Sequence, residues 1–173
     1  MQTARTDRIL QVSFGVLLAA FVYVIFVSLY EHIVVVGDTA PDFSITADNG
    51  QTVTRTNFGG KLLVLNFWAT WCAPCIEELP SLDEFQRQFA NSGVVVLGVS
   101  MDKDEKLYKR FLSRANVSFL TARDPANKIN AEYGTTKFPE TYIINSDGKV
   151  LMKIINSTNW VDEKMLRYVK SQL

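Results

Sequence analysis

The chain has 173 residues, of which 47% are hydrophobic and 21% are charged, a composition typical of a folded protein with a substantial core. Its 18 basic and 18 acidic residues cancel, so neither net charge nor a run of Lys or Arg indicates a nucleic-acid partner. The only two cysteines permit one intramolecular disulfide, and a bridge across so short a loop stabilises a fold very little. The pair therefore indicates chemistry rather than a structural staple.

The first predicted element is an uncharged apolar run over residues 9–30, long enough to cross a hydrocarbon core as a helix. Arg5 and Arg8 precede it and acidic residues follow it, so the positive-inside rule predicts a cytoplasmic N-terminus (residues 1–8) and a single-pass anchor. A cleavable signal peptide and a buried helix of a soluble protein are the alternatives. A signal peptide usually has a shorter apolar region, and residues 27–30 form a poor cleavage site.

A linker over residues 31–37 leads to one predicted domain, residues 38–173, of normal single-domain size. Its first feature is a β-hairpin, in which residues 43–46 and 51–54 flank Asp48-Asn49-Gly50. Asn-Gly favours such a turn because both residues readily take positive φ angles. The hairpin is expected as an extension before the main sheet.

The run LLVLNFW at residues 62–68 predicts a strand covered on both faces. Apolar residues then recur every three or four positions from Ile76 to Phe89, which predicts an amphipathic helix. A second apolar strand follows at residues 94–99. Strand, helix and strand in this order form a right-handed parallel crossover.

The remaining predicted elements follow from periodicity and turn residues. They are a helix at 103–115, a short strand at 117–121, a helix at 125–133 opened by Asp124, a hairpin of strands 141–145 and 149–155, and a closing helix at 161–173. The predicted fold class is therefore α/β, with a mixed central sheet and helices on both faces.

Cys72 follows the first buried strand and stands where the helix begins, with Pro74 tolerated in the first turn because a residue there needs no backbone donor. The partial positive charge of a helix N-terminus stabilises a thiolate, which makes such a cysteine nucleophilic near neutral pH. Cys75 lies one turn further along, close enough for a disulfide and more covered. The two can cycle between dithiol and disulfide through a mixed intermediate.

Glu78 lies at the third position after Cys75 and shares its helix face, whereas Glu77 points elsewhere. A carboxylate there fits a group that takes the proton Cys75 must lose when it resolves a mixed disulfide. A solvated helix carboxylate is the plain alternative for Glu78. For the cysteines the alternatives are a zinc site, for which His32 is the only remaining His or Cys ligand, and two inert buried thiols.

The segment from Trp68 to Cys75, WATWCAPC, resembles the active-site signature of thioredoxin-fold proteins. With Glu78 and Pro80 it forms WCAPCxxExP, which is similar to the TlpA/ResA/CcmG group of membrane-anchored bacterial thiol-disulfide oxidoreductases. The opening GDTAPDF at residues 37–43 is also similar to that group, so the resemblance covers residues 37–173.

The resemblance implies a thioredoxin-like fold with an N-terminal hairpin extension and assigns roles to individual residues. Asn66 stands where cytosolic thioredoxin carries a buried Asp, and Glu78 takes the acid role. Pro139 is implied as a cis-proline that faces the disulfide and pairs with an extended substrate segment. Phe138 stands where the CcmG branch has a small residue and is expected to reshape the groove. The implied substrate-binding residues are Trp71, Ala73, Pro74, Phe138, Pro139 and Glu140.

The implied function is a disulfide reductase on the periplasmic or extracytoplasmic side of the bacterial cytoplasmic membrane, acting on proteins such as apocytochrome c. Its redox centre is the Cys72–Cys75 pair without any cofactor or metal, and its implied electron donor is a membrane protein of the DsbD/CcdA type. A general disulfide oxidase or isomerase, a copper-binding module and a thiol peroxidase are the rival hypotheses.

Overall fold

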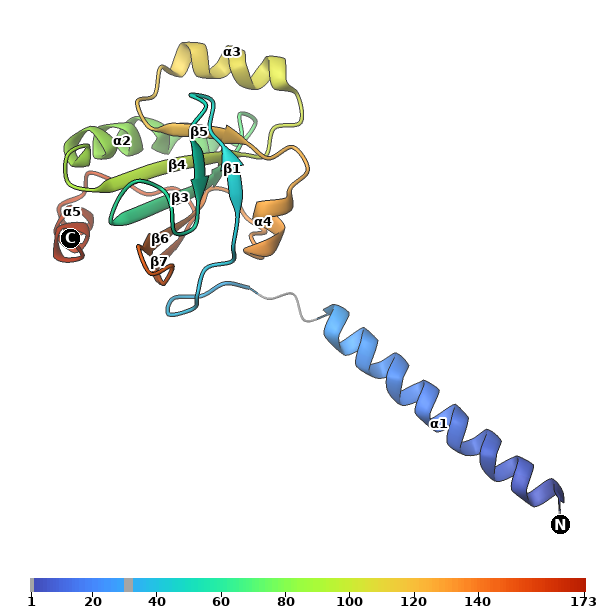
Figure 1. Ribbon diagram of the computed structural model, residues 1–173. Helices are drawn as coiled ribbons and strands as arrows, with labels where there is room; N and C mark the ends of the chain where they lie inside the picture. The colour runs from blue at the N-terminus through green and yellow to red at the C-terminus, as the bar shows by residue number, and fades with distance from the viewer. Residues whose placement is uncertain (1, 30–32) are drawn as a thin grey trace. The chain divides into compact units, whose positions relative to one another are not determined.

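The computed structural model describes the backbone of residues 2–29 and 33–173, and the side chains of residues 11–26 and 33–173. The chain forms two compact units, Met1–His32 and Ile33–Leu173. The first contains a single helix, α1 (Gln2–Leu29), and the second is the domain that carries both cysteines (Figure 1).

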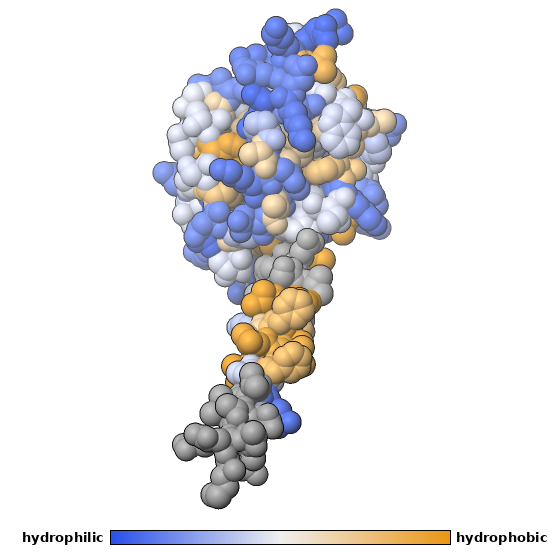
Figure 2. All heavy atoms as spheres, turned by 90° about the vertical axis from the view of Figure 1, so that its right-hand side faces the viewer, coloured by the Kyte–Doolittle hydropathy of each residue, from blue (hydrophilic) through white to orange (hydrophobic). Residues whose placement is uncertain are grey.

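Large hydrophobic side chains are exposed along the described part of α1, coloured orange in Figure 2. Among the described residues, however, no helix is both long and apolar enough to cross a membrane. The predicted anchor at residues 9–30 is thus not confirmed, and the predicted localisation in the cytoplasmic membrane is contradicted. The predicted cytoplasmic segment, residues 1–8, and residues 31–32 of the linker lie outside the described side chains.

The domain opens with the predicted hairpin, formed by β1 (Ser44–Thr46) and β2 (Thr52–Thr54) in antiparallel register. Gly50 takes a φ of 87° in the turn, where a side chain would be strained. The Asp48 carboxylate accepts hydrogen bonds from Tyr108 Oη at 2.6 Å and Thr121 Oγ1 at 2.8 Å. The tip of the hairpin is therefore fixed to the rest of the domain.

The main sheet has the strand order β5-β4-β3-β6-β7. Its central strand β3 (Leu62–Trp68) runs parallel to β4 (Val94–Ser100) and antiparallel to β6 (Glu140–Asn145). At the edges, β5 (Leu120–Arg123) is parallel to β4, and β7 (Val150–Ile155) pairs antiparallel with β6. This arrangement confirms the mixed sheet with parallel inner strands.

Two predicted elements begin three residues later than the sequence suggests. The strand expected at 117–121 begins at Leu120, because Asn116 ends the preceding helix in the left-handed conformation and the Asp83 carboxylate holds Ser118 in a loop. The helix expected at 125–133 is only α4 (Lys128–Glu132), because Asn127 has a φ of 57° and interrupts the helix.

Helices cover both faces of the sheet. Phe67 and Trp68 are neighbours on β3 and so point to opposite faces. The Phe67 ring packs on Tyr133 at the end of α4 with centroids 5.4 Å apart, and the Trp68 ring packs on Phe111 of α3 (Glu105–Ala115) at 5.5 Å. The remaining helices of the domain are α2 (Ala73–Phe89) and α5 (Glu163–Ser171) (Figure 1).

Candidate active site

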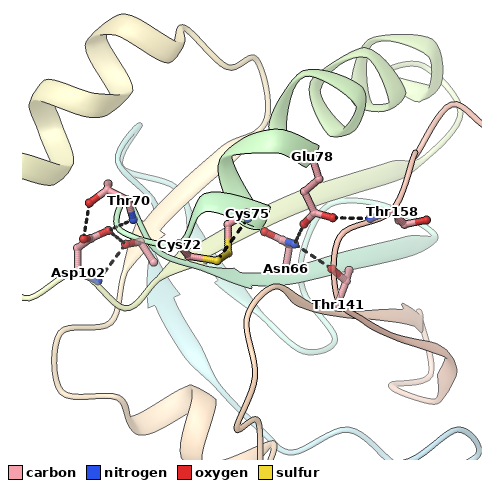
Figure 3. The surroundings of a disulfide bond; sticks show 9 residues. Asn66, Thr70, Cys72, Cys75, Glu78, Asp102, Thr141 and Thr158 are labelled. Atoms are coloured by element: carbon pink, nitrogen blue, oxygen red, sulfur yellow. Dashed lines mark hydrogen bonds between the residues drawn. A yellow bond between two sulfur atoms is a disulfide. The ribbon is translucent and has the colours of Figure 1, made fainter.

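The two cysteines form a disulfide at the junction of β3 and α2, with their Cα atoms 5.3 Å apart (Figure 3). Cys72 is the N-cap of α2, and its Sγ accepts a hydrogen bond from the Cys75 N–H at 3.3 Å. Cys72 keeps 7% of its surface exposed, whereas Cys75 is fully buried. A substrate can therefore approach the sulfur of Cys72, whereas the sulfur of Cys75 is not accessible from solvent.

Exposed side chains surround the edge of Cys72. Trp71, Ala73, Pro74 and Ile76 are all exposed, and Trp71 retains 66% of its surface. Trp71, Ala73 and Pro74 are predicted substrate-binding residues. Their exposed side chains are accessible next to the Cys72 sulfur, which the helix N-terminus would stabilise as a thiolate.

Glu78 is buried in α2 on the same face as Cys75, and Glu77 is exposed. The spacing argument made from the sequence is therefore confirmed for the orientation of these side chains. Burial is the main cause of a raised pKa for Glu78, and hydrogen bonds to the carboxylate partly oppose the rise. A carboxylate whose pKa is raised is a stronger base than an ordinary carboxylate, so it is better suited to accepting a proton.

Three donors from distant segments surround the Glu78 carboxylate. Asn66 Nδ2 donates to Oε1 at 2.8 Å, the Thr158 N–H donates to Oε2 at 3.2 Å, and Trp160 Nε1 donates to Oε2 at 3.4 Å. Asn66 Nδ2 also donates to Thr141 Oγ1 at 2.8 Å (Figure 3). The carboxylate thus connects α2 to β3, to β6 through Asn66, and to the loop after β7.

The Phe138–Pro139 peptide bond is cis, as the resemblance implies. The Phe138 ring contacts the Trp71 ring edge to face, with centroids 6.0 Å apart. This contact brings the cis-proline loop beside the segment that carries Cys72. Pro139 itself is buried, and Phe138 is half-buried.

Glu140, predicted to contact substrate, is instead turned into the domain. It retains 3% of its surface, forms an ion pair with Lys153 Nζ at 2.8 Å and accepts a hydrogen bond from Tyr142 Oη. Lys153 Nζ also donates to the Val34 carbonyl at 3.0 Å. Burial and the neighbouring Glu140 raise the pKa of Tyr142. The buried contacts of Glu140 therefore stabilise β6, the strand that begins directly after the cis-proline.

Sequence reasoning missed the contacts of Thr141, Thr158 and Trp160 around Glu78, and it noted Asn66 only by comparison with thioredoxin. Thr158 and Trp160 lie about 80 residues from Glu78 in the chain and carry no local signal. Among the described residues, no group of three or more His, Cys, Asp or Glu side chains is placed to hold a metal ion. His32, considered as a zinc ligand, lies outside the described residues.

Comparison with known proteins agrees with this geometry. The model of the AhpC/TSA family matches residues 36–153. The chain belongs to the AhpC/TSA family. This AhpC/TSA protein is 35% identical over 144 residues to the thiol-disulfide oxidoreductase ResA of Geobacillus thermodenitrificans, covering 82% of each chain.

A second relative, the thiol-disulfide oxidoreductase ResA of Bacillus thuringiensis, is 32% identical over 135 residues, which are 78% of this chain and 77% of the relative. A crystal structure from Chlorobium tepidum, assigned as a thiol:disulfide interchange protein DsbE, superposes with a TM-score of 0.73 at 27% identity and covers 80% of this chain and 98% of that chain. This AhpC/TSA protein is thus a thiol-disulfide oxidoreductase of the ResA/DsbE type with a thioredoxin-like fold.

Proposed function

We propose that the protein works in the reducing direction, transferring two electrons from Cys72 and Cys75 to a disulfide in a protein substrate. The observation that carries the proposal is Glu78, a buried carboxyl group with a raised pKa on the Cys75 face of α2. A reductase has to deprotonate its second thiol inside the domain, and a nearby carboxylate of raised pKa can accept that proton.

In the first step, the Cys72 thiolate attacks one sulfur of the substrate disulfide. An intermolecular disulfide forms, and the other substrate sulfur leaves as a thiolate. In the second step, Glu78 takes the proton of Cys75, and the Cys75 thiolate attacks Cys72 Sγ. The intermolecular bond breaks, and the second substrate sulfur also leaves as a thiolate. The proton held by Glu78 and one proton from solvent convert the two thiolates to a dithiol, and the enzyme keeps the Cys72–Cys75 disulfide.

The substrate segment would lie between two aromatic residues, the exposed Trp71 and the half-buried Phe138, and the cis-proline. Trp71 and Phe138 contact each other beside Cys72, and the backbone next to Pro139 offers hydrogen bonds to an extended peptide. The resemblance to TlpA/ResA/CcmG proteins supports an oxidised C-x-x-C-H segment of an apocytochrome c as the substrate class. A dithiol protein of the DsbD/CcdA type would then regenerate the enzyme.

The test is the midpoint potential of the Cys72/Cys75 couple in the full chain, measured against glutathione and dithiothreitol buffers. We expect a value near or below that of thioredoxin, about −270 mV. Such a protein should also reduce an oxidised C-x-x-C-H peptide, and the release of peptide thiols measures this reaction. A value near about −120 mV would reject the reducing direction and favour the rival hypothesis of a general disulfide oxidase.

A further inference from the structure

A second buried carboxylate, Asp102, lies on the other side of the active-site turn from Glu78. It retains 4% of its surface and follows β4. Its Oδ2 accepts hydrogen bonds from the Thr70 N–H at 2.9 Å and from Ser100 Oγ at 2.6 Å, and its Oδ1 accepts from Thr70 Oγ1 at 2.7 Å (Figure 3). Both oxygens of a buried charge are thus directed at the turn that precedes Cys72.

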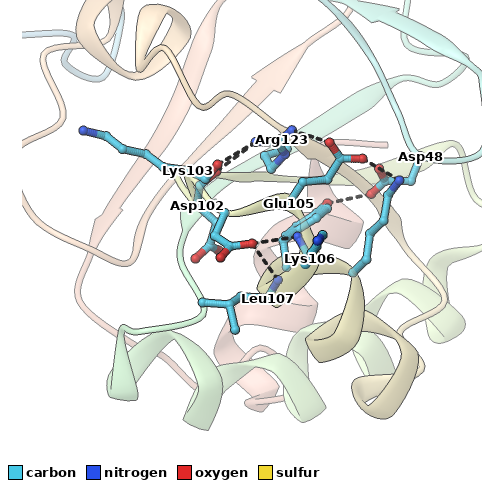
Figure 4. Close-up of polar contacts among 10 residues, drawn as sticks. Asp48, Asp102, Lys103, Glu105, Lys106, Leu107 and Arg123 are labelled. Carbon is cyan, nitrogen blue, oxygen red and sulfur yellow. Dashed lines mark hydrogen bonds and ion pairs between the residues drawn. The ribbon is translucent and has the colours of Figure 1, made fainter.

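The segment that carries Asp102 is itself held in place. The Arg123 guanidinium donates to the Asp102 carbonyl at 3.4 Å and to the Lys103 carbonyl at 3.1 Å, and it bonds the Glu105 carboxylate at 3.1 Å (Figure 4). On the other side, the Met101 N–H donates to the Trp68 carbonyl at 2.9 Å. The Asp102 carboxylate is therefore presented from a fixed loop.

The turn between β3 and α2 also contains a hydrogen bond of its own. The Cys72 N–H donates to the Ala69 carbonyl at 3.2 Å, which closes the turn on itself. Asp102 binds both the backbone and the hydroxyl of Thr70, two residues before Cys72. Two charge-assisted hydrogen bonds on one residue restrict its position more strongly than neutral bonds do.

From this geometry we infer, on the basis of the proposed reductase function, that Asp102 is a positioning residue for Cys72. It fixes the turn so that the Cys72 sulfur stays at the N-terminus of α2, where the free N–H groups stabilise the attacking thiolate. Asp102 touches neither sulfur in a bonding contact, and it acts through Thr70.

The other titratable or charged groups around Asp102 come from three elements. They are Lys103 in its own loop, Tyr108 of α3 and Arg123 of β5. The pKa of Tyr108 is raised, mainly by burial and by its hydrogen bond to Asp48, and Asp102 adds a smaller contribution. Substitution of Asp102 therefore removes two things, its negative charge and its hydrogen bonds to Thr70 and Ser100. Separate variants are needed to distinguish the two effects.

The experiment compares Asp102→Ala with Asp102→Asn, because both variants lose the charge but only Asn keeps the hydrogen bonds. The Asn oxygen can accept from the Thr70 N–H and Ser100 Oγ, while its amide donates to Thr70 Oγ1. The readout is the rate at which iodoacetamide alkylates Cys72 in the reduced full chain, as a function of pH. Asp124→Ala is the control, since Asp124 is also buried but caps α4 through Ile129 N.

We expect Asp102→Ala to be alkylated about tenfold more slowly at neutral pH than Asp102→Asn, in the range that misplacement of a reacting group costs. Asp124→Ala should keep the wild-type rate even where its melting temperature falls. If Asp102→Ala does not fold, Thr70→Val, which removes one of the bonds, should slow alkylation in the same direction. Equal rates for Asp102→Ala and Asp102→Asn, or an unchanged rate for Thr70→Val when Asp102→Ala is unfolded, would overturn the inference.

The alkylation rate needs no disulfide substrate, so it separates the two proposals. If the wild-type protein reduces no disulfide while the difference between the Ala and Asn variants persists, the reductase function fails and the positioning role of Asp102 stands. If the protein reduces disulfides and the two variants are equal, the opposite holds.

Discussion

Glu78 and Asn66 meet inside the domain through a hydrogen bond of 2.8 Å from Asn66 Nδ2 to Glu78 Oε1. Asn66 is fully buried, and its Oδ1 has no hydrogen-bond partner among the described residues. Rotation of the amide would place Asn66 Oδ1 opposite Glu78. Oδ1 can then accept a hydrogen bond from Glu78 Oε1 when that oxygen carries a proton. The pair can therefore accommodate both the ionised and the protonated forms of Glu78.

We expect Glu78→Gln to slow resolution of the mixed disulfide by about a hundredfold, the loss that removal of a general base commonly causes. Attack by Cys72 should change much less, because Cys72 depends on the helix N-terminus. Stopped-flow measurement of the two phases with a disulfide peptide checks this. Glu77→Gln is the matched control, since Glu77 is the adjacent exposed carboxylate, and equal losses in both variants would contradict the role of Glu78.

The same carboxyl group should make stability depend on pH. Burial holds the pKa of Glu78 above its ordinary value of 4.5, so the folded protein binds this proton more tightly than the unfolded chain does. The resulting stability is fully present below about pH 4.5 and is lost as the pH rises through the raised pKa. Urea unfolding of the oxidised protein should show this decline, and it should be absent in Glu78→Gln.

Asp83 should show the opposite dependence and serves as an internal contrast. Burial alone would raise the pKa of Asp83, but hydrogen bonds from Ser118 and the charge of Arg87 lower it overall. Its contribution to stability is therefore present above about pH 3.8 and is lost as the pH falls through the lowered pKa. As the pH falls below about 3.8, urea unfolding should show that wild type loses stability relative to Asp83→Asn. The same pH dependence in both proteins would contradict this assignment.

The unequal burial of the two sulfurs predicts selective trapping. Cys75→Ser should accumulate a covalent complex with a disulfide peptide through Cys72, because nothing resolves the mixed disulfide. Cys72→Ser should form little complex, since Cys75 is fully buried. Mass spectrometry under non-reducing conditions distinguishes the two, and efficient trapping by Cys72→Ser would show that the order of attack is wrong.

The aromatic pair beside Cys72 should contribute to substrate binding. Loss of the Phe138 ring by Phe138→Ala should raise KM for a disulfide peptide by about 2- to 10-fold, which corresponds to the ~0.5–1.5 kcal/mol of an aromatic contact, and leave kcat nearly unchanged. Steady-state kinetics measures this directly. Lys137→Ala, at the adjacent exposed position, is the control, and an equal effect there would argue against a specific role of the ring.

The ion pair between Glu140 and Lys153 should matter for stability. Lys153→Met leaves the Glu140 carboxylate buried without its cation, which commonly costs about 3–5 kcal/mol. The double variant Glu140→Gln with Lys153→Met removes both charges and should lose much less. Denaturant unfolding of wild type, of Lys153→Met and Glu140→Gln singly and of the double variant checks this, and additive losses would mean that the two charges do not interact.

Much of the fold was predictable because local patterns determine it. The apolar runs at residues 62–68 and 94–99 became β3 and β4, and the turn at Asp48-Asn49-Gly50 became the hairpin. The errors at Leu120 and Lys128 arose where a left-handed Asn, at 116 or 127, ended or delayed an element. Asn takes the left-handed conformation only in some structural contexts, so the presence of an Asn in the sequence does not predict this conformation.

The sequence by itself determined the redox pair, the helix that begins at it and the side of that helix on which Glu78 lies, because residue spacing and helix geometry are local properties. Only the tertiary structure decided what surrounds these groups. Asn66, Thr158 and Trp160 reach Glu78, and Asp102 reaches Thr70, from separate strands and loops. Such contacts depend on strand register and chain crossing, which arise when the whole core packs at once and which no short segment encodes.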